Sequence, residues 1–119
     1  MQLHKYNANG NDFIIFHSFI KKDRSTLAIE LCDRHKGLGA DGLIVLIPHK
    51  DYDFEWEFYN ADGSLANMCG NGSRATAHYA YLQGLTKHNE MKFLTGAGDI
   101  RASVYDNIVE TELTPPIIH

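Results

Sequence analysis

The sequence predicts an α+β fold in which a mostly antiparallel sheet is wrapped around a central helix. Two observations indicate this class. Two segments with helical character, about Arg24–Arg34 and the stretch from Gly72 to about Gln83, are each flanked by segments with strand character. Three further strand segments follow the second helix in a row, an order typical of α+β proteins.

The N-terminal part begins with two short strands, Leu3–Tyr6 and Asp12–His17, separated by the turn-forming run Asn-Ala-Asn-Gly-Asn. Asp23 can cap the first helix, for which we expect about residues 24–34. One face of that helix carries its apolar positions, namely Leu27, Ala28, Leu31 and Cys32.

The middle of the chain predicts two strands of different character. Leu43–Ile47 is a continuous apolar run that ends at Pro48, which indicates a strand covered on both faces. Phe54–Tyr59 alternates, with its three bulky aromatic residues Phe54, Trp56 and Phe58 on one face, which indicates a half-buried strand. The turn Asn60-Ala61-Asp62-Gly63 follows, because Asp-Gly supplies the positive φ that such turns need.

The second helix should stop at Gly84, and strands are expected at about Met91–Thr95, Ile100–Tyr105 and Ile108–Leu113. Thr114-Pro115-Pro116 then indicates a linker, since consecutive prolines extend neither a sheet nor a helix. We therefore expect one folded unit over residues 1–114, with residues 115–119 beginning a linker.

Composition limits the classes of function. The 119 residues are 44% hydrophobic and 22% charged, with a net charge of -4 when the seven histidines are neutral, which is typical of a globular protein. No run of Lys and Arg would neutralise phosphates, and no apolar run approaches the ~20 residues of a membrane span. We expect a cytoplasmic protein that binds neither nucleic acid nor membrane, with Cys32 and Cys69 reduced; a disulfide between the two is the alternative.

The segment Met68-Cys69-Gly70-Asn71-Gly72-Ser73-Arg74 carries the clearest chemical signal. A cysteine stands directly before two glycines that flank an asparagine, at the start of the second helix. The free N–H groups of a helix's first turn bind anions such as a carboxylate, and the same field lowers the pKa of a thiol. Thiolate and anion site together suit removal of a proton next to a carboxylate.

This segment and the ionisable residues also allow other interpretations. Cys69 could be an inert core cysteine. The run from Gly70 to Ala75 also matches the dinucleotide pattern G-x-G-x-x-G/A, but Glu90 precedes a strand instead of ending one, so we reject that interpretation. The histidines show no metal-binding spacing, and the acidic residues from Asp51 to Glu57 are expected to form a solvated face, so no metal site is predicted.

Four motifs, in order, resemble those of the diaminopimelate epimerase family, and the later Thr95-Gly96-Ala97-Gly98 turn also fits it. The motifs are Gly10-Asn11-Asp12-Phe13, Gly37-Leu38-Gly39-Ala40-Asp41-Gly42, Phe58-Tyr59-Asn60-Ala61-Asp62-Gly63-Ser64 and Met68-Cys69-Gly70-Asn71-Gly72. The resemblance covers nearly the whole chain. It implies a fold of two similar lobes, each a sheet wrapped on a central helix, of which this chain is the N-terminal lobe, and a homodimer for the complete enzyme.

The resemblance further implies conversion of LL-2,6-diaminopimelate to the meso form without pyridoxal phosphate or metal, so no cofactor is expected. It makes Cys69 one acid/base, Gly70 and Asn71 the binders of the substrate carboxylate, and Asn11 and Asn60 polar substrate contacts. Some members carry a glutamine contact at the position of Gly42, which a glycine cannot supply.

Inversion requires an acid and a base on opposite faces of the α-carbon, and the family carries its second cysteine in the second lobe. Cys32 lacks an adjacent glycine turn and is expected to pack in the core. Arg74 is expected to brace the glycine turn. Two other functions remain open: a half-site that holds a carboxylate without turnover, and a related isomerase of the proline-racemase or phenazine-biosynthesis type.

Overall fold

The computed structural model describes residues 2–66, 70–105 and 108–114, the last segment as backbone. Its elements are β1 (His4–Ala8), β2 (Asn11–His17), α1 (Ser25–Cys32), β3 (Gly42–Ile47), β4 (Phe54–Asn60), α2 (Gly70–Leu82), β5 (Glu90–Thr95), β6 (Gly98–Tyr105) and β7 (Ile108–Thr114). The strands form one seven-stranded sheet in sequence order. The β2–β3 and β4–β5 pairs are parallel and the other pairs are antiparallel, which confirms the predicted α+β class. The linker expected at residues 115–119 lies outside the described residues.

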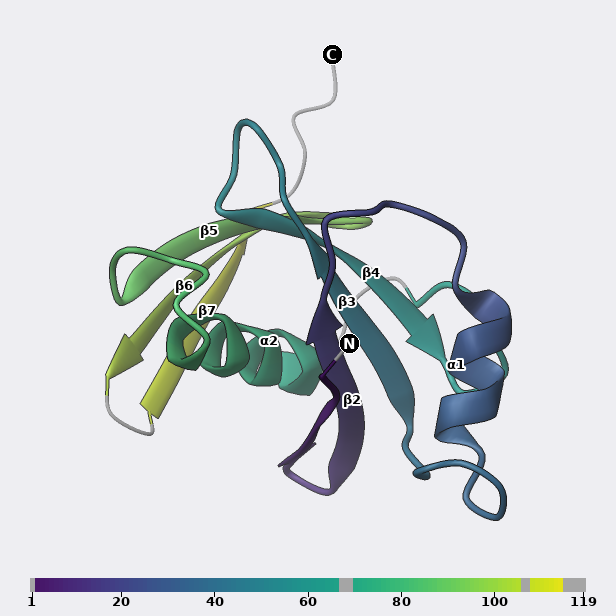
Figure 1. The fold of residues 1–119 in the computed structure, drawn as a ribbon. Helices are drawn as coiled ribbons and strands as arrows, with labels where there is room; N and C mark the ends of the chain where they lie inside the picture. The colour runs from purple at the N-terminus through teal and green to yellow at the C-terminus, as the bar shows by residue number, and fades with distance from the viewer. Residues whose placement is uncertain (1, 67–69, 106–107, 115–119) are drawn as a thin grey trace.

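The sheet curls, and each face carries one helix (Figure 1). Helix α2 lies inside the curl against β1, β2, β6 and β7, whereas α1 packs on the outer face against β3 and β4. The predicted central helix is therefore α2. None of the described helices is long and apolar enough to cross a membrane.

Alternation along β2 and β3 produces two cores, one on each side of the sheet. Phe13 and Ile15 face α2, while Ile14 and Phe16 face α1. All six residues of β3 are buried, which confirms that this strand is covered on both faces. Since a fully buried aliphatic or Phe side chain stabilises a fold by about 1.5–3 kcal/mol, these two strands anchor the whole sheet.

Helix α2 ends as its sequence predicts. Its last turn is followed by Gly84, whose φ of +70° is a conformation that glycine adopts without strain. The N–H of Leu85 donates to the carbonyl of Ala80 at 2.9 Å, and the N–H of Gly84 donates to that of Tyr81 at 3.2 Å. These two bonds form a Schellman motif, which satisfies carbonyls that a helix end would otherwise leave free.

Helix α1 is shorter than the sequence predicts, ending at Cys32 instead of Arg34. The cause is Asp33, whose backbone is extended and whose carboxylate accepts the N–H groups of His35 and Lys36 at 2.7 and 3.0 Å. This local turn competes with helix continuation. At the other end Asp23 accepts the N–H of Ser25 at 2.9 Å, so the expected capping carboxylate is in contact with the first turn.

Candidate functional site

The candidate site lies at the start of α2, next to the β1–β2 hairpin. Cys69 lies outside the described residues. Gly70 begins α2 and is exposed, and a Cβ added to Gly70 would meet no atom within 4 Å, so the helix start is open on that side. The N–H groups of a helix's first turn, with the positive end of the helix dipole, suit a carboxylate.

Two of the predicted substrate-contact residues are brought together at this helix start. Asn71 Nδ2 donates to Asn11 Oδ1 at 2.7 Å, which joins the first turn of α2 to the first residue of β2. The Asn71 side-chain oxygen also accepts from Arg74 Nη1 at 3.5 Å, as expected if Arg74 braces this turn. Asn11 and Asn71 come from motifs 60 positions apart in sequence.

The β1–β2 hairpin turn is built from Asn9 and Gly10, which have φ of 51° and 88°. Asparagine and glycine are the residues that tolerate this left-handed pair, the usual turn of a two-residue hairpin. Asn9 Nδ2 donates to Asn71 Oδ1 at 3.2 Å, so the tip of the hairpin also contacts α2. The contact of Asn9 is not predicted from the sequence: the Asn-Gly pair signals the turn, but nothing in it signals the contact.

The first two family-like motifs contact each other through carboxylates. The N–H of Asp12 donates to Asp41 Oδ2 at 2.8 Å, and the N–H of Asp41 donates to the carbonyl of Asp12 at 2.9 Å. Arg34 bridges both carboxylates, at 3.3 Å from Asp12 and 3.1 Å from Asp41. The hydrogen bond from the Asp12 N–H, with smaller contributions from the Asn11 amide and Arg34, lowers the pKa of Asp41. The carboxylate of Asp41 therefore helps to hold Asn11 in place, through the Asn11 amide and the adjacent Asp12 N–H.

Asn60 lies at the same end of the sheet but farther along it. It is paired in register with Gly42 on β3, and Gly42 is paired with Phe13 on β2. Two strand spacings, about 10 Å, thus separate Asn60 from β2. Asn60 Nδ2 donates to Ser64 Oγ at 3.1 Å across the Asn60–Gly63 turn, where Gly63 has the expected positive φ of 86°.

Close packing against Phe58 and Tyr59 requires a glycine at position 42. A Cβ at this position would lie 2.8 Å from Phe58 Cε1 and 2.9 Å from the carbonyl oxygen of Tyr59. A larger residue would displace the Phe58 ring, which packs edge to face on Phe13. The glycine therefore offers no side chain to a ligand and keeps the strands beside Asn60 close together.

Cys32 is a free, buried thiol in the outer core, which confirms the prediction that it packs there. Burial, assisted by the negative charge of Asp41, raises its pKa to about 11. A thiol that stays protonated at neutral pH is a poor nucleophile or base. Cys32 cannot therefore replace a thiol at the start of α2.

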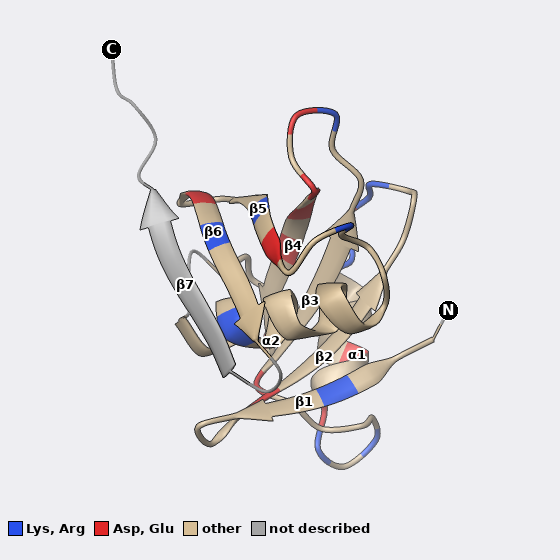
Figure 2. Cartoon of the chain, turned by 90° about the vertical axis from the view of Figure 1, so that its left-hand side faces the viewer, with Lys and Arg blue, Asp and Glu red and all other residues tan. Residues whose placement is uncertain are grey.

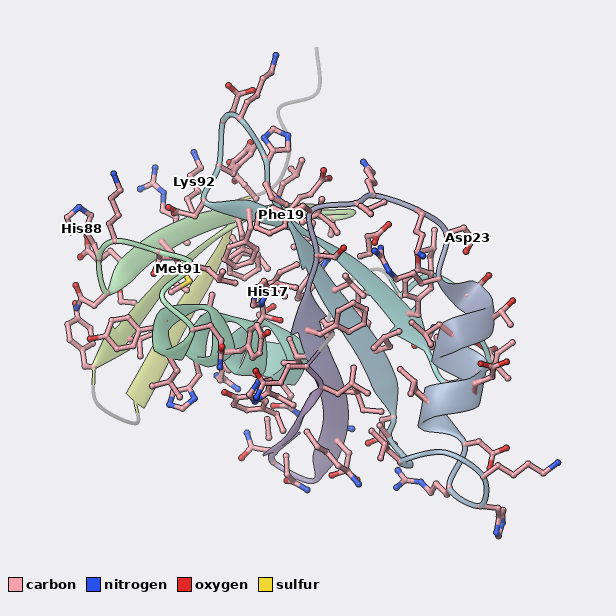
Figure 3. The ribbon with its side chains drawn as sticks, in the orientation of Figure 1. His17, Phe19, Asp23, His88, Met91 and Lys92 are labelled. Carbon is pink, nitrogen blue, oxygen red and sulfur yellow. The ribbon has the colours of Figure 1, made fainter. Side chains whose placement is uncertain are left out.

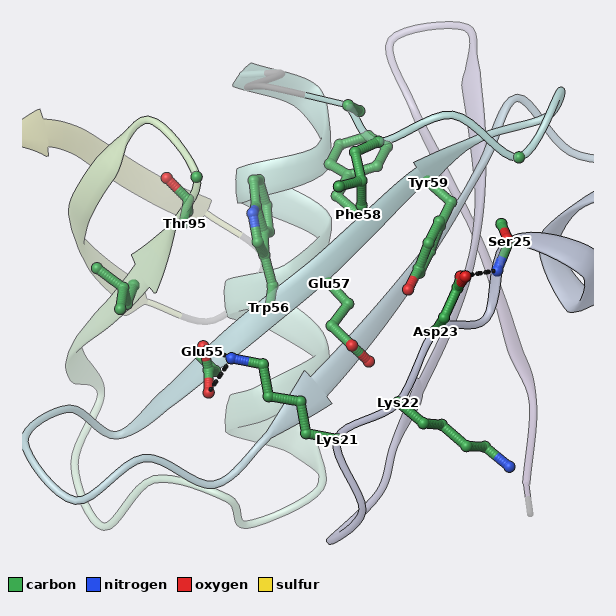
Figure 4. A pocket seen from close by; sticks show the side chains of 15 residues that line it. Lys21, Lys22, Asp23, Ser25, Glu55, Trp56, Glu57, Phe58, Tyr59 and Thr95 are labelled. Carbon is green, nitrogen blue, oxygen red and sulfur yellow. Dashed lines mark hydrogen bonds and ion pairs between the residues drawn. The ribbon is translucent and has the colours of Figure 1, made fainter.

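A cavity of about 760 Å³ opens beside β4, where β4 and β5 diverge after a short parallel pairing (Figure 4). Its lining includes Lys21, Glu55, Trp56 and Thr95, and it contains none of the predicted substrate contacts. Tyr59 and Gly63 do line it, so the cavity borders the turn that carries Asn60, whereas its lining does not include the first residues of α2.

The prediction that the acidic residues from Asp51 to Glu57 form a solvated face is wrong in part. Glu57 is paired with Arg24, and both side chains are largely buried, at 12% and 4% exposed. Glu55 pairs with the exposed Lys21 at 3.4 Å. Figure 2 shows acidic positions on β4, which lies between β3 and β5, and on a loop outside the sheet. Alternation predicted that the acidic side chains share a face, but only tertiary structure covers that face with the 18–24 segment.

The histidines of the described part form no metal cluster with Cys, Asp or Glu. His17, seen between the end of β2 and α2 in Figure 3, places its Nδ1 2.7 Å from the Tyr79 hydroxyl. His78 lies edge to face with Tyr6, with 5.9 Å between ring centroids. These histidines serve packing, as expected for His78.

Comparison with known proteins identifies the family. The family model described as diaminopimelate epimerase matches residues 3–117. The diaminopimelate epimerase of Nitratiruptor sp. is 67% identical over 99% of this chain and 47% of its own length, and that of Campylobacter lari is 61% identical over 96% and 45%. The chain thus spans about half the length of these relatives. A probable proline racemase from Agrobacterium radiobacter shares the fold, with a TM-score of 0.69 at 18% identity over 88% of this chain and 38% of that one. Together with the four motifs, these matches show that the chain belongs to the diaminopimelate epimerase family.

Proposed function

We propose that this chain forms one half of the active site of an isomerase that interconverts LL- and meso-2,6-diaminopimelate. The observation that supports this most is the hydrogen bond between Asn11 and Asn71 at the start of α2, in a member of this family. It gathers two separate family motifs around a helix start that suits a carboxylate. The chemistry needs neither pyridoxal phosphate nor metal.

In this proposal the carboxylate on the reacting carbon binds the N–H groups of Gly70 and Asn71, while Asn11 and Asn60 contact polar groups of the substrate. Cys69, which directly precedes Gly70 in the sequence, acts as thiolate and removes the α-proton to become a thiol. The electron pair left on the carbon is stabilised next to the bound carboxylate. A second thiol then gives a proton from the opposite face, and the configuration inverts.

The second thiol has to come from outside this half-site, because the buried Cys32 stays protonated. We place it in a second lobe that faces the start of α2. The complete enzyme is proposed to work in the cytoplasm and to be a homodimer. A mass measurement in solution would test the proposed dimer.

The test is Cys69→Ser in a full-length protein that contains this chain, with Cys32→Ala as the matched control. An alcohol is too weak an acid to replace the thiol, so epimerisation from both LL and meso substrate should fall at least 10²-fold. The Cys32→Ala variant should keep its rate. Cys69→Ser activity above about a tenth of wild type would remove Cys69 from the mechanism. A wild-type protein that binds diaminopimelate without exchanging its α-proton would indicate a binding half-site instead.

A further inference from the structure

The side chain of Asn71 has both of its polar atoms engaged inside the protein. Its Nδ2 donates to Asn11 Oδ1 at 2.7 Å. Its Oδ1 accepts from Asn9 Nδ2 at 3.2 Å and from Arg74 Nη1 at 3.5 Å. The side-chain oxygen of Asn71 is an acceptor, so a carboxylate at this helix start would be bound by N–H groups and not by that oxygen.

Two charged side chains fix the orientation of the Asn71 amide: Arg74, which contacts Asn71 directly, and Asp41, which contacts its partner Asn11. Arg74 has donors and no acceptor, so the group of Asn71 that faces it must be the oxygen. Asp41 has acceptors and no donor when ionised, so the group of Asn11 that hydrogen-bonds it must be the NH₂. The Asn11 oxygen is then left to face Asn71 Nδ2, as observed.

Asn9 is the part of this arrangement that no family motif includes. Its backbone is left-handed, with φ of 51°, and this conformation directs the side chain of the hairpin tip onto α2. Asn7, in the same hairpin, donates to Asp12 Oδ1 at 2.7 Å and accepts the N–H of Gly10 at 3.3 Å. Asn7 thus holds the turn itself, whereas Asn9 joins the turn to the helix.

We propose that Asn9 is a positioning residue, which acts through the Asn71 side chain to hold the first turn of α2 so that its N–H groups meet the substrate carboxylate. This inference rests on the proposed function. Because Asn9 contacts Asn71 and not the reacting carbon, it affects substrate binding more than the proton-transfer step.

The test compares Asn9→Gly with Asn7→Ala in a full-length protein that contains this chain. Glycine accepts the φ of residue 9 without strain, so this variant removes the donor and leaves the turn conformation. The loss of one neutral hydrogen bond predicts a rise of about fivefold in KM for diaminopimelate in both directions, with kcat changed less than twofold. Asn9→Asp, which keeps the shape and removes the donor, should raise KM at least as much. Asn7→Ala should lower the melting temperature and leave KM unchanged.

A KM within twofold of wild type for Asn9→Gly would overturn the proposal, as would losses that follow the melting temperature equally in both variants. A second readout is independent of turnover: the side-chain ¹⁵N–¹H signals of Asn71 in asparagine-labelled protein. They should shift in Asn9→Gly and not in Asn7→Ala. If wild type shows no epimerase activity, the proposed function fails, and these signals alone decide whether Asn9 positions Asn71.

Discussion

The hydroxyl of Tyr79 lies 2.7 Å from Nδ1 of His17, a contact that joins α2 to the end of β2 across 62 positions of sequence. Tyr79 is 1% exposed, and its ring meets those of His4 and Tyr6 edge to face. Burial raises the pKa of Tyr79, so the hydroxyl stays protonated at neutral pH. The C-terminal half of the helix that begins at the candidate site is therefore held to the sheet by this polar contact within an aromatic cluster.

Removal of that hydroxyl should weaken the attachment of α2. Tyr79→Phe keeps the ring packing and loses the bond to His17, so we expect the free energy of unfolding to fall by about 1 kcal/mol. Urea unfolding followed by circular dichroism measures this difference. Tyr81→Phe, on the exposed side of the same helix, is the control and should change stability by less than about 0.5 kcal/mol. Equal losses in the two variants would contradict the role assigned to the contact.

The buried pair Arg24–Glu57 should be costly to break from one side. Arg24→Met leaves the Glu57 carboxylate without its cation in a largely buried position, and we expect a loss of about 3–5 kcal/mol in unfolding free energy. The double change Arg24→Met with Glu57→Gln should recover part of that loss, since no charge is then left unpaired. Lys21→Met, which removes the exposed partner of Glu55, should cost no more than about 1 kcal/mol. A double variant less stable than Arg24→Met would argue against an unpaired charge as the cause.

Acid should destabilise the chain partly through Asp41. Its pKa is lowered in the folded state, chiefly by the Asp12 N–H, so its carboxylate contributes stability above the unfolded pKa of about 4. That contribution is lost as the pH falls through the lowered value. We expect the melting temperature to drop between about pH 5 and pH 3, and to drop less steeply for Asp41→Asn. Thermal melts over this range test it, with the exposed Asp51→Asn as control; identical slopes for wild type and Asp41→Asn would refute it.

Asn11→Ala and Asn60→Ala should weaken substrate use in a full-length protein. Each removes a polar contact proposed for diaminopimelate, so KM should rise several-fold while the fold persists. Asn60 also donates to Ser64 Oγ within its turn, so Ser64→Ala is the control for a purely local role. If Ser64→Ala raises KM as much as Asn60→Ala, Asn60 is only a turn former. Steady-state kinetics beside thermal melts separate the two effects.

The chain of 119 residues should show no epimerase activity by itself, because its half-site presents one proposed thiol to one face of the α-carbon. The experiment measures mass in solution and follows deuterium uptake at the substrate α-carbon in D₂O. Turnover by a monomer would contradict the two-thiol requirement. Turnover confined to a dimer would indicate that two copies share a site, each supplying Cys69.

Local pattern in the sequence predicted most elements and the family. Alternation over Phe54–Tyr59 predicted β4, because side-chain direction in a strand repeats every two residues. The continuous apolar run Leu43–Ile47 predicted β3 as a strand covered on both faces. Gly84 marked the end of α2 because a left-handed residue there favours glycine. The four motifs pointed to the diaminopimelate epimerase family before any geometry was known, although the role of Cys69 stays a prediction.

Tertiary structure alone decided how those parts meet. Glu57 looked solvated along its strand and is instead covered by Arg24, which lies 33 positions away. Asn9 looked like a turn residue and instead contacts Asn71, 62 positions away. Periodicity and turn chemistry act over a few neighbouring residues, whereas these contacts depend on how the sheet curls and where each helix lies on it. The sequence thus determined the elements and the family, and the packing of α2 against the β1–β2 hairpin determined which side chains share the candidate site.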